Sequence, residues 1–192
     1  DMSHIEPSPI PAQGFYLSLL YQYHLNGGDI SEYYGFAKSI FETIAKSEAC
    51  GVGLCRGYSL IPDFRETILE NGNDLSAFNN SSLYCAVCAM KELAEAQGDI
   101  KMQREAAELA EKMKVNFPRI LFDEEKGFFV SSADAVTLEK RKVFMSPSIK
   151  WDNLFCRDLI TDKQKQLLEF FEKNFVCECG IMYAPVWGVG YD

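Results

Sequence analysis

Gly27-Gly28-Asp29 recurs as Gln97-Gly98-Asp99, and each tripeptide stands between two stretches with the apolar spacing of helices. Positions 28 and 98 are 70 residues apart. Glycine at these positions can close one helix in the left-handed conformation, and the aspartate that follows can cap the next helix. Glu32, three residues after Asp29, predicts a capping box at the first joint. The recurrence predicts a chain built from stacked helical hairpins.

The stretches on either side of these joints differ in how much of their surface is apolar. Residues 13–26 are apolar around most of the circumference, which predicts a helix buried on most sides, and residues 31–47 predict its partner. In the second hairpin the stretch before Gln97 is largely apolar, whereas residues 101–117 carry a charged face. One helix of this hairpin is therefore expected to be inner and the other outer.

A third joint is predicted at Thr161-Asp162-Lys163-Gln164, where Thr161 caps a helix and Gln164 closes the box. It would connect helices over residues 148–159 and 162–175. Long loops are expected over residues 48–79 and 131–147, and the run from Phe122 to Phe129 predicts a small β-hairpin. We therefore expect one all-α domain over residues 1–192, made of about three stacked hairpins with long loops.

The composition is typical of a single compact domain, and the net charge disfavours some classes of binding partner. A chain of 192 residues with 47% hydrophobic side chains can bury one sizeable core. The 28 acidic and 19 basic side chains give a net charge of -9, which argues against a general attraction to nucleic acid or to an anionic membrane. No stretch reaches the roughly 20 apolar residues of a membrane span, and no signal peptide is recognised. The start at Asp1 is expected of a mature product or of a piece of a longer polypeptide.

The seven cysteines predict reduced thiols and hence a cytoplasmic setting. Cys85 and Cys88 fall in an apolar helical pattern without the βαβ context of a redox motif, so they are expected to be ordinary thiols. The loop cysteines lack the two-residue spacing of a zinc knuckle: Cys50, Cys55, Cys177 and Cys179. We expect no metal and no cofactor.

Several segments together resemble the repeat of a known architecture. They are the opening of the inner helix, the second joint and the run after the outer helix: Asn79-Asn80-Ser81-Ser82-Leu83-Tyr84, Gln97-Gly98-Asp99 and Phe122-Asp123-Glu124-Glu125-Lys126-Gly127-Phe128-Phe129. They are similar to the repeat of the six-hairpin glycoside hydrolases, the (α/α)6 toroids that include trehalases and glucoamylase-like and rhamnosidase-like enzymes. The likeness covers residues 13–175 as architecture. It implies a toroid that hydrolyses an oligosaccharide or glycoside in a cleft formed by the loops at one end.

The resemblance also implies roles for residues in the loop over 48–79. Pro62-Asp63-Phe64-Arg65 is similar in position to the family segment that carries the general acid, which makes Asp63 the candidate acid and Arg65 a substrate contact. Glu66 and Asp74 compete for the acid's role. From the residues alone, each of these carboxylates can also be a solvated loop acid or a helix cap.

Aromatic side chains in the loops provide candidate sugar contacts, because aromatic rings stack on the apolar faces of sugars. The candidates for substrate binding are Tyr58, Trp151, Tyr183 and Trp187. Trp151 stands at the start of a predicted helix and can also be a core residue.

The chain is too short for a complete six-hairpin toroid, and this raises an alternative to the enzyme interpretation. Six hairpins of 70 residues exceed a chain of 192, so the chain is expected to supply about half a toroid, completed by the remainder of a longer polypeptide or by a second copy. Glycoside hydrolysis needs a second carboxyl group, which is expected beyond the end of this chain. The rival interpretation is a non-catalytic helical-repeat module that binds a glycan or a protein. The long loop over 48–79 favours the enzyme, because interaction solenoids usually keep their connections short.

Overall fold

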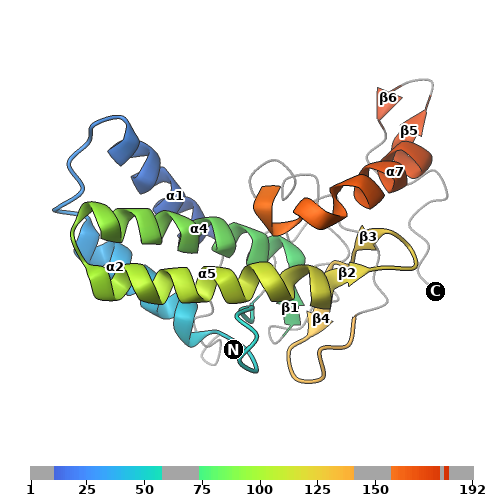
Figure 1. The fold of residues 1–192 in the computed structure, drawn as a ribbon, viewed down its shortest axis with the longest axis horizontal. Helices are drawn as coiled ribbons and strands as arrows, with labels where there is room; N and C mark the ends of the chain where they lie inside the picture. Colours follow the sequence, from blue (N-terminus) through green and yellow to red (C-terminus); the bar gives the residue numbers. More distant parts are fainter. Residues whose placement is uncertain (1–10, 58–73, 141–156, 178–179, 182–192) are drawn as a thin grey trace, which may run out of the picture.

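The computed structural model describes residues 11–57, 74–140, 157–177 and 180–181 (Figure 1). Its helices are α1 (Pro11–Leu25), α2 (Tyr34–Lys46), α4 (Ala77–Ala96), α5 (Ile100–Leu121) and α7 (Gln164–Phe175), with the 3-10 turns η1 (Arg157–Leu159) and η2 (Thr161–Lys163) before α7. Short antiparallel strand pairs join β1 (Asp74–Ser76) to β4 (Ser132–Asp134), β2 (Phe122–Asp123) to β3 (Phe128–Phe129) and β5 (Val176–Cys177) to β6 (Gly180–Ile181). The described part of the chain is therefore mostly helical, as expected of an all-α domain.

α4 is the inner helix of the central hairpin. It packs along α1 and α5 and also contacts α2. Its buried side chains point in most directions around the helix, whereas α5 buries one stripe and turns its charged face to solvent. The buried residues of α5 are Met102, Ala106, Leu109, Ala110, Met113, Phe117, Ile120 and Leu121. The predicted inner and outer helices are confirmed for this hairpin.

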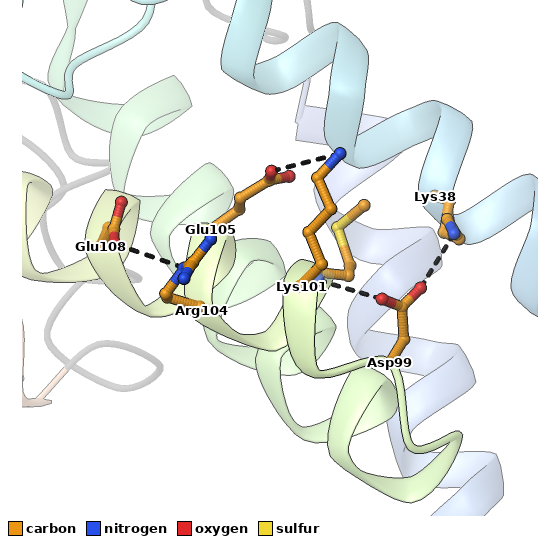
Figure 2. A network of polar contacts seen from close by, with 7 residues as sticks. Lys38, Asp99, Lys101, Arg104, Glu105 and Glu108 are labelled. Carbon is orange, nitrogen blue, oxygen red and sulfur yellow. Dashed lines mark hydrogen bonds and ion pairs between the residues drawn. The ribbon is translucent and has the colours of Figure 1, made fainter.

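The joint at Gly98 closes α4 and opens α5 within three residues. Gly98 has a φ of +69°, and the N–H groups of Gly98 and Asp99 donate to last-turn carbonyls of α4 at 3.0 and 2.9 Å, which is the Schellman pattern. The Asp99 carboxylate accepts from the Met102 N–H at 3.1 Å, so it caps α5 as predicted. Its other oxygen accepts from the Lys38 ammonium of α2 at 2.8 Å. Figure 2 shows this pair beside the ion pairs along the outer face of α5.

The joint at Gly27 stops its helix in the same way. Gly27, rather than Gly28 as predicted, takes the left-handed conformation, with a φ of +85°. The N–H groups of Gly27 and Gly28 donate to last-turn carbonyls of α1 at 2.9 and 3.0 Å. At Gly28 a Cβ would lie 2.3 Å from the ring of Tyr23, so a larger residue there would require this exposed ring to move.

The same joint restarts its second helix later than predicted. Asp29 accepts from the Ser31 N–H at 3.0 Å in an exposed local turn. α2 begins only at Tyr34 and has no side-chain capping hydrogen bond. The predicted capping box of Asp29 and Glu32 is therefore wrong, because the residues that would form it precede the helix.

α1 is less buried than its composition predicts. Leu17 is fully buried on the side that faces α4, where a Cβ on Gly14 would lie 2.8 Å from the Ser82 carbonyl oxygen. Phe15 and Leu19, on the opposite side, are exposed. The prediction that this helix is buried on most sides is therefore wrong for the described structure, in which α4 covers one side.

The segments between the hairpins contain more structure than predicted. β2 and β3 form the predicted small β-hairpin, whose turn is closed by Asp123 accepting from the N–H groups of Glu125 and Lys126. β1 and β4 pair with each other, although both fall within the loops predicted over 48–79 and 131–147. α4 also begins earlier than expected, at Ala77. Strands of three residues carry too little periodicity to be recognised from the sequence.

The third joint differs from its prediction. Thr161 opens η2, and α7 begins at Gln164 with Lys163 at its N-cap position, so this position does not fall on Thr161 as predicted. The helix expected over 148–159 lies mostly outside the described residues, and its last three residues form η1. Among the described helices, none combines the length and apolar character needed to cross a membrane.

Candidate functional site

The amino end of α4 is the most polar part of the described interior. Among the described residues, every buried Asp, Asn and Ser lies here: Asp74, Ser76, Asn79, Asn80, Ser81, Ser131 and Ser132. They come from β1, from the start of α4, from the first residue of β4 and from the residue before it. Burying polar groups is costly unless they are hydrogen-bonded, so this concentration marks a specific feature of the fold. We call these residues the polar cluster.

β1 runs directly into α4, and Ser76 forms the junction. The Ser76 backbone is extended, and its hydroxyl accepts from the Asn79 N–H at 3.3 Å as the N-cap of α4. The N–H of Ala77 donates to the Ser131 carbonyl at 2.9 Å, and the strand register places Ser76 opposite Ser132. The start of α4 is therefore fixed against β4.

Asn80 ties the loop that precedes Gly57 to α4. Its Oδ1 accepts from the Cys55 N–H at 2.6 Å, and its Nδ2 donates to the carbonyls of Cys55 and Ser76 at 3.0 and 2.9 Å. Asn116 of α5 adds a second anchor by donating to the carbonyl of Val52 at 2.9 Å. The loop is therefore held by side chains from both helices of the central hairpin.

Asp74 is the predicted acid that the described residues include. It is 1% exposed, and the Ser132 hydroxyl donates to its Oδ2 at 3.4 Å. The Asp74 carbonyl accepts from the Gly57 N–H at 3.2 Å. Asp134, opposite it in register, accepts from N–H groups of its own turn. The sequence predicted Asp74 in a loop, but the structure places it in the buried strand β1.

The other predicted site residues lie outside the described residues: Tyr58, Asp63, Arg65, Glu66, Trp151, Tyr183 and Trp187. The first four belong to residues 58–73, and the described residues on either side of this segment are Gly57 and Asp74. Besides the hydrogen bond between these two, Gly57 also forms a β-bridge with Leu75. Gly57 therefore contacts β1, which contributes Asp74 and Ser76 to the polar cluster.

Three residues of the polar cluster, Asn80, Ser131 and Ser132, carry no predicted site role. A signal for the first was present, because Asn79 and Asn80 interrupt an apolar helical pattern at positions that the pattern would bury. The two serines carry no comparable signal. The Ser131 hydroxyl is buried and makes no hydrogen bond within the described structure. It is therefore a polar group of the cluster that could serve a ligand or a water molecule.

Tyr84, one turn along α4 from Asn80, connects this end of the helix to η1. Its hydroxyl donates to Oδ2 of Asp158 at 3.0 Å. Burial, followed by the nearby Cys88 and Asp158, raises the pKa of Tyr84 above its usual value. The phenol therefore stays protonated at neutral pH and remains a donor to Asp158.

The Cys55 and Cys88 thiols are poor nucleophiles. Burial raises the pKa of Cys55 to about 12 and that of Cys88 to about 11, so both thiols are protonated at neutral pH. In the ranges that the structure covers, no three His, Cys, Asp or Glu side chains gather closely enough to hold a metal ion.

An open groove of about 600 Å³ lies elsewhere, between the turn of the β2–β3 hairpin and α7. Its lining mixes charged side chains such as Glu124, Lys126 and Glu169 with the rings of Phe128 and Phe170. It includes no residue of the polar cluster and no predicted site residue. We place the candidate site at the polar cluster, because buried polar groups concentrate there.

No protein-family model matches the sequence, and no curated protein matches it. A function therefore has to be inferred from the polar cluster and the helical hairpins.

Proposed function

We propose that the chain is a glycoside hydrolase-like domain of the (α/α)-toroid type, acting on an oligosaccharide or glycoside by carboxylate general acid/base catalysis. One observation carries the proposal: the described residues on either side of 58–73, the range that contains Asp63 and Glu66, are Gly57 and Asp74, and they are hydrogen-bonded to each other at 3.2 Å. Asp74 belongs to the polar cluster at the amino end of the inner helix.

In this proposal Asp63 is the general acid, which protonates the leaving-group oxygen of the glycosidic bond. Glu66 is the alternative acid, and Arg65 contacts sugar hydroxyls. Asp74 suits a positioning role better than direct proton transfer, because it is buried and accepts from Ser132. Stacking on the sugar rings is assigned to Tyr58, Trp151, Tyr183 and Trp187.

The polar cluster supplies the rigidity that such a site needs. Catalytic groups lose rate when they are misplaced by as little as 1 Å, so the elements that carry them have to be held firmly. Asn80 holds the preceding loop by hydrogen bonds to Cys55, and Ser76 fixes the start of α4. These bonds support residues on both sides of the acid-bearing segment.

The proposal includes a partner for the helical hairpins. The three hairpins predicted from the sequence would make half of a six-hairpin toroid, and in this proposal the remaining hairpins come from a longer polypeptide or from a second copy. The second catalytic carboxylate is assigned to those hairpins.

The test is hydrolysis of a panel of disaccharides and aryl glycosides by the wild type and by Asp63→Asn, Glu66→Gln and Asp74→Asn. We expect Asp63→Asn to lower kcat/KM by about 10²- to 10⁴-fold, the usual contribution of a general acid. Glu125→Gln, an exposed acid of the β2–β3 turn, is the matched control and is expected to leave kcat/KM unchanged.

Three outcomes would revise the proposal. Loss of activity in Glu66→Gln but not in Asp63→Asn would transfer the acid's role to Glu66. Unchanged activity in both variants would remove the acid from this segment. Binding of a glycan without turnover of any substrate would favour the non-catalytic helical-repeat module.

A further inference from the structure

α1 presents an apolar ridge to solvent on the side away from α4. Phe15, Leu19 and Tyr23 are 55%, 69% and 49% exposed, and their spacing of four residues aligns them along one face. α1 contains no Asp, Glu, Lys or Arg among its 15 residues. A helix that is apolar on all sides is normally buried on all sides, so the exposed side of α1 is suited to contact with another apolar surface.

The ridge continues onto α2. Tyr33 and Phe36 are 45% and 59% exposed. Edge-to-face ring contacts join the two helices, from Tyr23 to Tyr33 at 6.4 Å and from Tyr16 to Phe36 at 5.2 Å between centroids. The exposed rings therefore form one continuous face, and their contacts with each other hold them in place.

The exposed part of this face is on the order of 600 Å², taking about 200 Å² for each large side chain. That is at the upper limit of the apolar patches that monomers expose, about 300–600 Å². It is also most of the roughly 800 Å² that each partner buries in a standard protein interface. Two such faces would bury about 1,200 Å² in total, the lower end of the range for specific protein interfaces.

We propose that this face is a homodimer interface, in which α1 packs antiparallel on α1 of a second copy. The ridge is symmetric about Leu19, so a two-fold axis at Leu19 would set Phe15 against the partner's Tyr23. Ridges of residues four apart interdigitate in the most common class of helix packing. The arrangement is independent of the proposed hydrolase chemistry.

Charge favours a second copy at this place over others on the surface. Two chains of net charge -9 repel each other, and the repulsion is smallest where neither carries an ionised side chain. α1 is such a surface. The outer face of α5, by contrast, exposes Lys101, Arg104 and Glu108.

The mass of the full chain in solution tests the proposal, measured by light scattering after size exclusion over a range of micromolar concentrations. We expect the wild type to reach twice the chain mass and Leu19→Glu to stay at the chain mass. The matched control is Val115→Glu on α5, where the replaced side chain is similarly exposed (63%) but lies outside the face, and it is expected to remain dimeric. Circular dichroism checks that all three retain the same helix content.

A cross-link tests the axis itself. Leu19→Cys places a thiol next to its own copy, so mild oxidation is expected to give a reducible dimer in a yield well above that of the wild type, which carries the exposed Cys50 as background. A wild type that remains monomeric at every concentration would overturn the proposal. So would a dimer that persists in Leu19→Glu, or a Leu19→Cys yield equal to that of the wild type.

Discussion

The hairpins α1–α2 and α4–α5 end their first helices with the same motif and begin their second helices differently. Gly27 and Gly98 both take the left-handed conformation and close a Schellman motif. Asp99 then caps α5 at once and pairs with Lys38, whereas Asp29 forms an exposed turn and α2 starts without a side-chain cap. The glycine determines where the first helix ends. The start of the second helix depends on the contacts of the aspartate, which are the Met102 N–H and Lys38 for Asp99 and only the Ser31 N–H for Asp29.

The central hairpin is also held at its other end. Asn80 bonds the loop before Gly57 to α4, and Ser76 caps that helix. α1–α2 contributes Lys38 to the central hairpin and exposes an apolar ridge of its own. The difference indicates that α4–α5 is the stable frame of the described structure, and that α1–α2 is placed by packing on it.

The largest difference is expected when an asparagine is removed from each hairpin. Asn80→Ala strips the hydrogen bonds from the buried N–H and C=O of Cys55, so we expect it to lower the free energy of unfolding by about 2–3 kcal/mol. Asn26→Ala removes an exposed bond to the Gln22 carbonyl and is expected to cost less than about 0.5 kcal/mol. Urea denaturation measures both, and equal losses would contradict the stable-frame account.

The two glycines are expected to behave alike, which tests the shared motif. Gly27→Ala and Gly98→Ala each force an L-residue into the left-handed conformation, at a cost of about 1 kcal/mol. Neither site has atoms within 4 Å of the added Cβ, so the cost is purely conformational. Gly35→Ala, in α2 and equally uncrowded, is the control and is expected to stabilise by about 0.5–1 kcal/mol. A loss at one glycine only would show that the two stops are not equivalent.

The two aspartates are expected to differ. Asp99→Ala removes both the cap of α5 and the ion pair with Lys38, and we expect the melting temperature to fall by about 2–5 °C. Asp29→Ala removes only a local turn bond to Ser31 and is expected to change the melting temperature by less than about 1 °C. Differential scanning calorimetry of both variants gives the comparison, and the reverse order would refute it.

The smallest expected effect is the pH dependence of the Lys38 pair. Lys38, followed by the Met102 N–H, lowers the pKa of Asp99 below its usual value of 3.8. Because the pKa is lower in the folded protein than in the unfolded chain, the stabilisation is present above pH 3.8 and is lost as the pH falls through the folded value. Asp99→Asn keeps a capping side chain and removes the charge. The stability difference between wild type and Asp99→Asn should therefore shrink below pH 4, and a difference that grows there would contradict this sign.

The helical class and the central hairpin could be predicted because helical periodicity and glycine stops are local. The inner and outer roles of α4 and α5 followed from the polar face of residues 101–117, and the structure confirms them. The predicted match between the two joints was wrong by one residue. The glycine that corresponds to Gly98 in backbone conformation is Gly27 and not Gly28. The match was made from the similarity of the two tripeptides. The left-handed conformation, however, falls on the glycine that follows the last helical turn, whatever residue comes next.

The candidate site could be predicted only in part, because its bonds join distant segments. Asn80 bonds Cys55, which is 25 residues away, and Ser132 bonds Asp74, which is 58 residues away. No pattern of neighbouring residues in the sequence predicts hydrogen bonds between residues so far apart. The exposed side of α1 was not predicted for a related reason. An apolar helix sequence indicates that the helix packs against other elements, but it does not indicate which side they contact. The roles of Asp63 and Glu66 stay predictions.

The most direct measurement for the hydrolase assignment is how the effect of Asp63→Asn depends on the leaving group. A general acid matters most when the departing oxygen needs a proton, as in a phenyl glycoside, and least when the departing phenolate is already stable, as in a dinitrophenyl glycoside. The account predicts a loss of at least about 100-fold on the phenyl glycoside and little loss on the dinitrophenyl glycoside. Equal losses on the two substrates, or a wild type that hydrolyses neither, would contradict it.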